Sequence, residues 1–181
     1  MIVSDCTGSS GSSTPIEEEE ESMRLDKIFE VGAGTLFQNI VLADMKLYGT
    51  TWMRALVRKM KMTDTSRSGS DDDGGGGGGG IQRLEFRELK LSTSQVVLFA
   101  KGLAETTTLK ELSFGTVSFV DPTRAVRILV AGLQANQSIE RLSLVRCQLH
   151  DKQLAMLSYA LCHHRNLEEV DLSGNHCRGL G

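Results

Sequence analysis

The chain lacks the features that mark secreted, membrane-spanning and nucleic-acid-binding proteins. No basic segment followed by an apolar one lies near its N-terminus, so we expect no secretory signal. No apolar run approaches the roughly 20 residues that a membrane-spanning helix needs. The formal net charge of −3 at pH 7 is unlike the concentrated basic surface of nucleic-acid-binding proteins. A chain of 181 residues is long enough to bury one moderate core, so we expect one globular domain and neither nucleic acid nor a membrane as partner.

Cysteine is also sparse. Cys6, Cys147, Cys162 and Cys177 are not spaced like the disulfide framework of a small secreted domain, and the chain is too large to depend on one. We therefore predict a cytoplasmic protein, with the nucleus as the alternative compartment, because both keep thiols reduced.

Sequence motifs for catalysis are missing as well. There is no G-x-S-x-G, no H-E-x-x-H and no pair of carboxylates spaced for acid–base chemistry. The seven glycines at positions 74–80 are followed by Ile81 and Gln82 instead of the Lys of a phosphate-binding loop, and the aspartates at 71–73 would repel phosphate. We therefore predict that the protein is not an enzyme and holds no cofactor.

Two segments are too poor in apolar residues to offset the entropy of ordering. Residues 1–22 are rich in Ser, Gly and Glu, and residues 65–80 are almost entirely Ser, Asp and Gly. We predict a disordered acidic tail over 1–22 and a disordered Asp/Gly-rich insertion over 65–80. Between them, Leu25, Ile28 and Phe29 have helical spacing, which predicts an N-terminal capping helix over 23–36.

The rest of the chain repeats one pattern of apolar positions. Four copies share it: Ile81-x-x-Leu84-x-Phe86-x-x-Leu89-x-Leu91, Leu109-x-x-Leu112-x-Phe114-x-x-Val117-x-Phe119, Ile139-x-x-Leu142-x-Leu144-x-x-Cys147-x-Leu149 and Leu167-x-x-Val170-x-Leu172-x-x-Asn175-x-Cys177. They begin 28, 30 and 28 residues apart. An upstream copy, Phe37-x-x-Ile40-x-Leu42-x-x-Met45-x-Leu47, begins 44 residues before Ile81, and removing the 16-residue insertion restores 44 − 16 = 28. We therefore place the insertion inside one repeat.

Each copy changes its period from two to about 3.6 part-way through, as a strand followed by a helix does. The helical stripes are Met53, Leu56, Val57 and Met60; Val96, Phe99, Ala100 and Leu103; Val126, Leu129, Val130 and Leu133; and Leu154, Leu157 and Leu161. A unit of about 28 residues cannot bury such a stripe alone, so we expect neighbouring units to stack into a continuous core.

This pattern resembles the leucine-rich repeat in its ribonuclease-inhibitor-like form, L-x-x-L-x-L-x-x-(N/C)-x-L followed by a helix. The resemblance covers residues 37–181 apart from the insertion, as about four full repeats and one truncated repeat. It implies an α/β fold, a solenoid shaped as a partial horseshoe with parallel strands on the concave face and helices on the convex face. The Asn/Cys position holds Met45, Leu89 and Val117 in the first three copies, so the Asn bonds to the turn backbone should be absent there.

Charged residues occupy the positions between the core leucines, which should point to the concave face. The position before the second leucine reads Arg83, Glu111, Arg141 and Glu169, and parallel strands would place these residues about 4.8 Å apart. Two interpretations stay open: a solvated charge ladder, or a partner-binding surface. For the second we select Arg83, Glu85, Arg87, Glu111, Arg141, Val145, Glu169 and Asp171.

Five residues of metal-ligand type occur near the C-terminal end: Cys162, His163, His164, His176 and Cys177. The first three should end a helix, and the last two should follow the next strand, on the far side of the repeat. Because Cys177 also occupies a core position, we interpret these residues as structural and predict no metal site.

We expect a non-enzymatic protein–protein interaction module that binds through the concave strand face. The alternatives are a regulator of a small GTPase, because the Ran GTPase-activating protein is built on similar repeats, and a repeat fragment of an innate-immune-type sensor. The last copy stops at "CRGLG", where its helix should begin. We therefore predict a fragment of a longer repeat protein, or self-association or end-on binding through residues 167–181.

Overall fold

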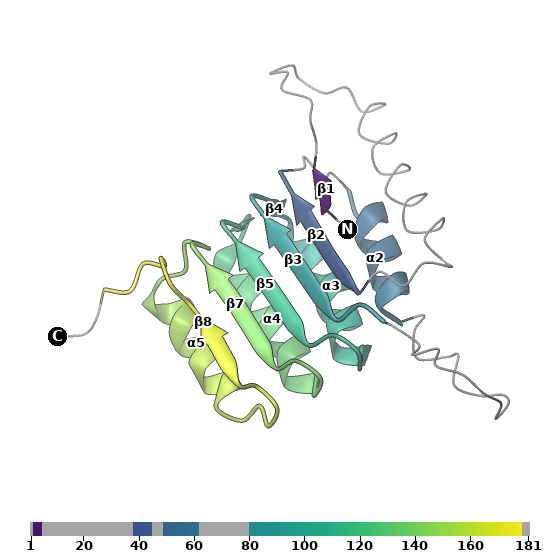
Figure 1. Ribbon diagram of the computed structural model, residues 1–181. Coiled ribbons are helices and arrows are strands. Elements are labelled where there is room, and N and C mark those ends of the chain that lie inside the picture. Colours follow the sequence, from purple (N-terminus) through teal and green to yellow (C-terminus); the bar gives the residue numbers. More distant parts are fainter. Residues whose placement is uncertain (1, 5–37, 45–48, 62–79, 179–181) are drawn as a thin grey trace, which may run out of the picture.

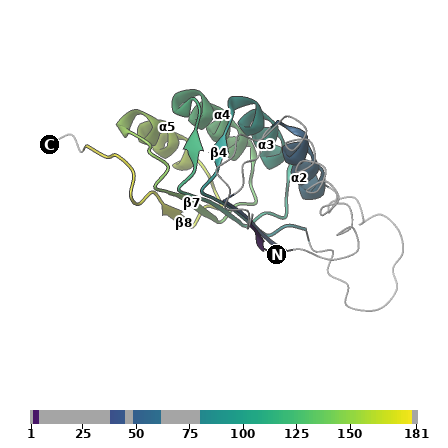
Figure 2. The ribbon, with the colours of Figure 1, turned by 90° about the horizontal axis from the view of Figure 1, so that it is seen from above.

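The chain folds as two layers, a parallel sheet and a row of helices. The computed structural model describes residues 2–4, 38–44, 49–61 and 80–178. Within these ranges six strands form one open parallel sheet in the order β1-β2-β3-β5-β7-β8, and β4 pairs with β6 in a separate two-stranded sheet. Figures 1 and 2 show the helices side by side over one face of the large sheet. The fold is therefore of the α/β class.

Strands and helices alternate along the chain. The elements are β1 (Ile2–Ser4), β2 (Asn39–Ala43), α2 (Thr51–Lys61), β3 (Arg83–Arg87), β4 (Lys90–Leu91), α3 (Thr93–Glu105), β5 (Glu111–Gly115), β6 (Ser118–Phe119), α4 (Pro122–Ala135), β7 (Arg141–Val145), α5 (Asp151–Leu161) and β8 (Glu169–Asp171). No helix in the described ranges combines the length and the apolar character needed to cross a membrane.

Strand pairing follows the alignment of the copies. Arg83 pairs with Glu111, Glu111 with Arg141, and Arg141 with Glu169. Asn39 of the upstream copy pairs with Arg83 across the insertion. From β2 to β8, one step across the large sheet thus corresponds to one copy of the sequence pattern.

The N-terminal edge of the sheet holds a strand that the sequence analysis missed. Ile2–Ser4 pair in parallel with Val41–Ala43. The prediction of a disordered tail over 1–22 is wrong for these three residues, because their main chain pairs with an edge of β2 that no other strand occupies among the described residues. The rest of that tail, the predicted capping helix at 23–36 and residues 65–79 of the predicted insertion lie outside the described residues.

The core lies between the two layers and is built from the predicted apolar positions. In β3 and β5, Leu84, Phe86, Leu112 and Phe114 are at most 1% exposed. The rings of Phe86 and Phe114 stack with centroids 5.1 Å apart, and Phe99 of α3 meets them edge-on at 5.3 and 6.0 Å. These offset and T-shaped contacts are the favourable geometries for aromatic rings, so the strands and α3 share one tightly packed centre.

Polar residues at the helix starts define where the chain leaves the strand layer. Ser92 caps α3 and forms a capping box with Gln95, whose side chain accepts from the Ser92 N–H at 2.8 Å. Asp121 caps α4, which has Pro122 in its first turn. Further along, a Cβ atom on Gly132 of α4 would lie 2.8 Å from the Ala100 carbonyl oxygen of α3, so the close approach of these helices requires glycine there.

Each copy turns at the same place with a left-handed residue. Asp44, Glu88, Thr116, Arg146 and Gly174 have φ values of 51°, 54°, 56°, 53° and 72°. The N–H of each of the first four donates to a carbonyl at the end of the next strand at 2.9–3.1 Å. The turn is therefore regular even where Leu89 and Val117 replace the Asn, because main-chain bonds between copies hold it.

The last copy is much less buried than the others. Its Val170 is 41% exposed, whereas the equivalent Leu112 and Leu142 are 1% exposed. Leu167 and Leu172 are half-buried, as are Leu154 and Leu161 of α5. The outer edge of β8 has no neighbouring strand in the described part of the chain.

Candidate functional site

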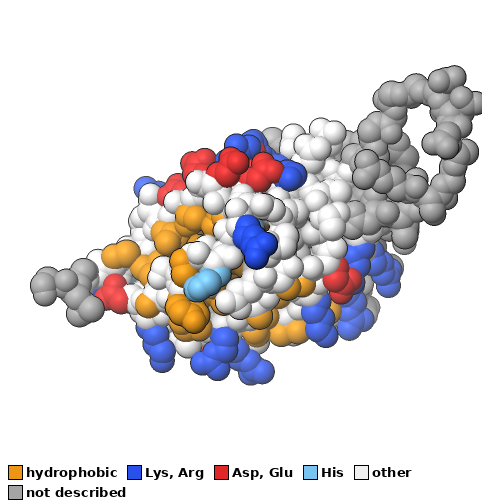
Figure 3. Space-filling view, turned by 90° about the horizontal axis from the view of Figure 1, so that it is seen from below, with side chains coloured by type: hydrophobic (Ala, Val, Ile, Leu, Met, Phe, Trp, Pro, Cys, Tyr) orange, Lys and Arg blue, Asp and Glu red, His pale blue; other side chains and the backbone are white. Residues whose placement is uncertain are grey.

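The candidate site lies on the sheet face that the helices leave uncovered, which we call the open face. Side chains alternate across the sheet, so when the leucines of a strand point into the core, the residues between them point to the open face. Figure 3 shows acidic and basic side chains side by side along this side of the molecule, above the exposed hydrophobic side chains. The charged ladder predicted from the sequence therefore lies on one continuous surface.

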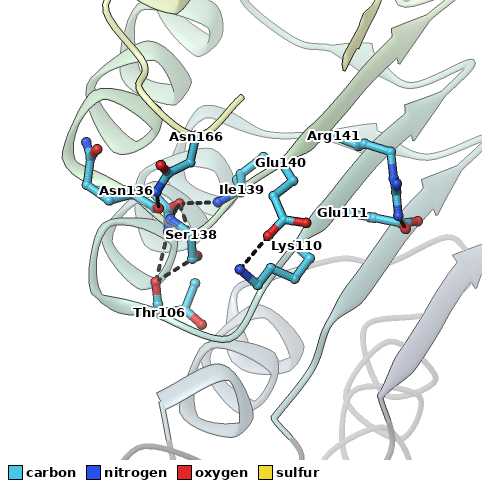
Figure 4. Close-up of polar contacts among 10 residues, drawn as sticks. Thr106, Lys110, Glu111, Asn136, Ser138, Ile139, Glu140, Arg141 and Asn166 are labelled. Carbon is cyan, nitrogen blue, oxygen red and sulfur yellow. Dashed lines mark hydrogen bonds and ion pairs between the residues drawn. The ribbon is translucent and has the colours of Figure 1, made fainter. Parts of the chain in front are cut away.

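Glu111 is the centre of this surface. Its carboxylate accepts from Nε of Arg83 through one oxygen and from Nη2 of Arg141 through the other. The Glu111 side chain is only 19% exposed, whereas those of Arg83 and Arg141 are 54% and 49% exposed. Figure 4 shows Arg141 and Glu111 on adjacent strands with their charged ends together. Each arginine thus binds Glu111 through its guanidinium group, while about half of its side chain surface stays exposed to solvent.

This geometry changes the acidity of the central carboxyl group. The hydrogen bond from Arg83 lowers the pKa of Glu111 below its ordinary value, and the bond and charge of Arg141 act in the same direction. Partial burial opposes the shift but is the weaker influence. Glu111 is therefore ionised at neutral pH, and the three-residue ion pair is fully formed there.

The surface around this ion pair is hollowed. A cavity of about 300 Å³, open to solvent, lies over β3, β5, β7 and β8. It is lined by Arg83, Glu85, Glu111, Leu112, Ser113, Arg141, Leu142, Ser143, Glu169 and Asp171. Its walls thus combine both charges with two hydroxyl groups, and its floor includes core leucines.

Six of the eight predicted site residues line the cavity. The other two differ from that expectation. Arg87 is outside the lining but pairs with Glu85, which belongs to it. Val145 pairs with Gly115 at the end of β7 and is not part of the lining. The structure therefore concentrates the charged candidates and leaves Val145 apart from them.

The two acidic residues at the β8 end differ from Glu111. Neither Glu169 nor Asp171 makes an ion pair within the described ranges. Asp171 instead accepts from the Ser173 N–H at 2.9 Å, and hydrogen bonds from Ser173 lower its pKa. The cavity thus has paired opposite charges at its centre and acidic groups outside any ion pair of the described residues at its β8 end.

Another ion pair, which the sequence analysis missed, lies just before the strands. Lys110 Nζ is 2.6 Å from Glu140 Oε1 (Figure 4). The signal was available, because Gln82, Lys110, Glu140 and Glu168 occupy one equivalent position of the copies. The serines of the lining could also have been chosen from the alternation, which places Ser113 and Ser143 on the open face.

One buried asparagine supports the loop that enters β7. Asn136 is 1% exposed, and its Nδ2 donates to the carbonyls of Leu103 and Thr106 at 2.7 and 2.9 Å. Its Oδ1 accepts from the N–H groups of Ser138 and Ile139 at 2.8 and 3.0 Å (Figure 4). All four bonding positions are filled, so Asn136 fixes how successive copies follow each other.

The cysteine and histidine residues near the C-terminal end do not converge. Cys162 Sγ lies 3.0 Å from His163 Nδ1, whereas the His176 ring lies against that of His150, with centroids 5.0 Å apart. No group of three or more His, Cys, Asp and Glu residues suited to a metal occurs in the part of the chain that the structure describes. Burial raises the pKa of Cys147 to about 11, so this thiol is protonated at neutral pH.

Comparison with known proteins adds no assignment. No protein-family model matches the chain, and no curated protein matches it either.

Proposed function

We propose that this chain is a non-enzymatic protein-interaction module of the leucine-rich repeat type, and that it binds another protein through the open face. The repeat spacing, the one-copy-per-strand register and the left-handed turn in every copy support this type of solenoid. Asn175 supports it too, because its Nδ2 donates to Leu144 and Leu172 while its Oδ1 accepts from Cys147 and Leu149. In such a solenoid the open face is the concave side.

The observation that carries the proposal is the ion pair of Glu111 with two arginines in a solvent-open cavity. Half of each arginine side chain is exposed, although its guanidinium is already paired with Glu111. A partner that binds there orders few additional side chains, which lowers the entropic cost of association. This pairing supports a partner-binding surface over a solvated charge ladder.

The mixture of charges favours a protein partner. A nucleic acid would need a uniformly basic surface, but the cavity lining contains two arginines and four acidic residues. Alternating charges at fixed positions select a partner with the complementary order and reject others, which is how charged protein interfaces gain specificity.

The test is affinity capture from native lysate with the Arg83→Glu/Arg141→Glu variant. We expect it to lose partners that the wild-type protein retains, because both arginines reverse charge around Glu111. A matched control, Lys101→Glu/Arg127→Glu, makes the same change at exposed positions of α3 and α4 and should retain them. Circular dichroism checks that both variants fold. Equal capture by all three proteins would contradict the proposal.

A further inference from the structure

The end of the sheet carries a second inference, which concerns the main-chain edge of β8 and shares Glu169 and Asp171 with the open-face cavity. We propose that the outer edge of β8 binds an extended segment of another polypeptide as an added parallel strand. The segment has a basic–apolar–basic pattern, with its basic residues beside Glu169 and Asp171 and its apolar residue beside Val170.

The main chain at this edge lacks bonds that every earlier copy makes. The carbonyls of Gln82, Lys110 and Glu140, which precede successive strands, each accept two N–H groups from the next copy at 2.8–3.1 Å. The equivalent Glu168 carbonyl accepts none from the described residues, and the Gly174 N–H has no acceptor among them. Such groups in an exposed strand edge are a template for pairing with another strand.

One apolar side chain at this edge, that of Val170, is exposed, whereas the equivalent residues of earlier copies are covered. Val170 is 41% exposed, but its counterparts Leu112 and Leu142, which have a strand on both sides, are 1% exposed. Figure 3 shows hydrophobic side chains gathered toward this end of the molecule. An apolar residue in the same register on an added strand would continue the column and remove Val170 from water.

The charges at the edge specify the rest of the pattern. Glu111 has an arginine on each neighbouring strand, whereas Glu169 has Arg141 on one side and no strand of the described ranges on the other. Glu168 and Asp171 add two more negative charges, and none of the three acidic residues makes an ion pair in the described ranges. Continuing the alternation therefore places a Lys or Arg beside Glu169 and favours another beside Asp171.

The same charges argue against a second copy of this chain in that position. A parallel β8–β8 pair would set Glu169 against Glu169, and an antiparallel pair would set Glu169 against Asp171 around a central Val170. Like charges directly opposite each other destabilise a strand pair. A basic segment of a different protein fits the edge, and a second β8 does not.

The chain supplies a template for the probe. β7 already pairs with a glutamate-bearing strand in this way, because Arg141 lies opposite Glu111. The probe is a fluorescein-labelled peptide of residues 139–148 carrying Ser143→Lys and Cys147→Ser, IERLKLVRSQ. The control peptide, IEELELVRSQ, differs from the probe only at its third and fifth positions, where Glu replaces Arg and Lys. Binding to the full chain is measured by fluorescence anisotropy.

We expect the probe to bind saturably and the control peptide to bind at least tenfold more weakly. The Glu169→Lys/Asp171→Lys variant should weaken probe binding at least tenfold and strengthen binding of the control peptide. A variant that prefers the control peptide to the probe would show that residues 169 and 171 lie beside the bound peptide. A general loss of stability would weaken the binding of both peptides and would not reverse the preference. Absence of probe binding, or equal binding of both peptides, would overturn the proposal.

Two further measurements test whether the probe binds the open face instead, and whether a second copy of the chain occupies the edge. An Arg83→Glu variant alters the open face at the far end of the cavity and should leave probe binding within about twofold. If that variant abolishes binding and the β8 variant does not, the probe binds the open face; the edge proposal then fails while the open-face proposal stands. Light scattering should give a constant mass as concentration rises. A dimer that the probe dissociates would show that a second copy occupies the edge and would also overturn the proposal.

Discussion

The copies that begin at Leu109 and at Leu167 follow the same sequence pattern but have different surroundings. In the first, Leu112 and Phe114 lie between strands on both sides and are 1% exposed. In the second, Val170 is 41% exposed and Leu172 is half-buried. The pattern sets which side of a strand is apolar in both copies, but burial depends on the neighbour that each copy meets.

The two copies also hold their turns differently. The Leu109 copy has a buried Val117 after its left-handed residue Thr116, and inter-copy main-chain bonds hold the turn. The Leu167 copy places Gly174 and Asn175 there, and Asn175 makes four hydrogen bonds to the backbone. At this turn, hydrogen bonds from the Asn175 side chain stand in place of the buried apolar residue.

The largest effect should come from truncating the core of the two copies. Leu112→Ala removes a fully buried side chain and should cost about 3 kcal/mol of the free energy of unfolding. Val170→Ala removes a half-covered one and should cost less than about 1 kcal/mol. Urea unfolding monitored by circular dichroism measures both. Equal losses would mean that the edge of β8 is covered in the free protein.

Replacing Asn136 and Asn175 by alanine compares the stability that hydrogen bonds contribute in a buried loop and in a partly buried turn. Asn136→Ala removes four hydrogen bonds to backbone groups of a buried loop, where the Thr106 carbonyl keeps the Ser138 hydroxyl as a donor but the N–H groups of Ser138 and Ile139 lose this acceptor. It should destabilise the fold by about 2–3 kcal/mol. Asn175→Ala removes four hydrogen bonds as well, but water reaches that turn, so we expect about 1 kcal/mol. The same unfolding experiment applies. A larger loss for Asn175→Ala would show that the last turn is the more tightly packed of the two.

Substituting the left-handed residues Thr116 and Gly174 should change the stability of the fold in opposite directions. Thr116 is β-branched and has φ of 56°, so Thr116→Gly should stabilise the fold by about 0.5–1 kcal/mol by removing backbone strain. Gly174→Ala should destabilise it by about 1 kcal/mol, because φ is 72° and the added Cβ would lie 2.6 Å from Arg146 Cγ. Melting temperatures of both variants test this; a loss at Thr116→Gly would show that its side chain contributes more than the strain costs.

The smallest effect concerns the charge of Glu111 compared with that of Glu169. The folded-state pKa of Glu111 is lowered from its ordinary 4.5, so the ion pair stabilises the fold above that pH and is lost as the pH falls through the lower folded pKa. Glu111→Gln should therefore cost up to about 1 kcal/mol at pH 7, and the difference from wild type should shrink below pH 4.5. Glu169→Gln, without an ion pair, should change little at either pH. A difference for Glu111→Gln that persists at low pH would assign its effect to packing.

Much of the fold follows from local pattern. The period-two segments became β3, β5, β7 and β8, and the helical stripes became the buried sides of α2, α3 and α4. The spacing also predicted the register across the insertion, because Asn39 pairs with Arg83. These features were predictable because the alternation of side chains in a strand and their 3.6-residue period in a helix are properties of the backbone itself.

The candidate site was predictable in position but not in its contacts. Arg83, Glu111 and Arg141 were placed on one face by alternation, yet nothing in the spacing shows that both arginines bind the same carboxylate. The Asn136 bonds were missed for a related reason, because their partners lie about 30 residues away in another copy. Val145 was selected by alternation alone and does not line the cavity.

The sequence by itself determined the repeat, the apolar side of each element and the order of charges along the open face, since these depend only on residue spacing. Tertiary structure alone decided which copies are buried, how Ile2–Ser4 complete one edge of the sheet, and how Glu111 divides its two oxygens between Arg83 and Arg141. Those outcomes depend on which neighbour a residue meets after folding. Equivalent residues such as Leu112 and Val170 therefore share a position in the pattern and differ in their exposure to water.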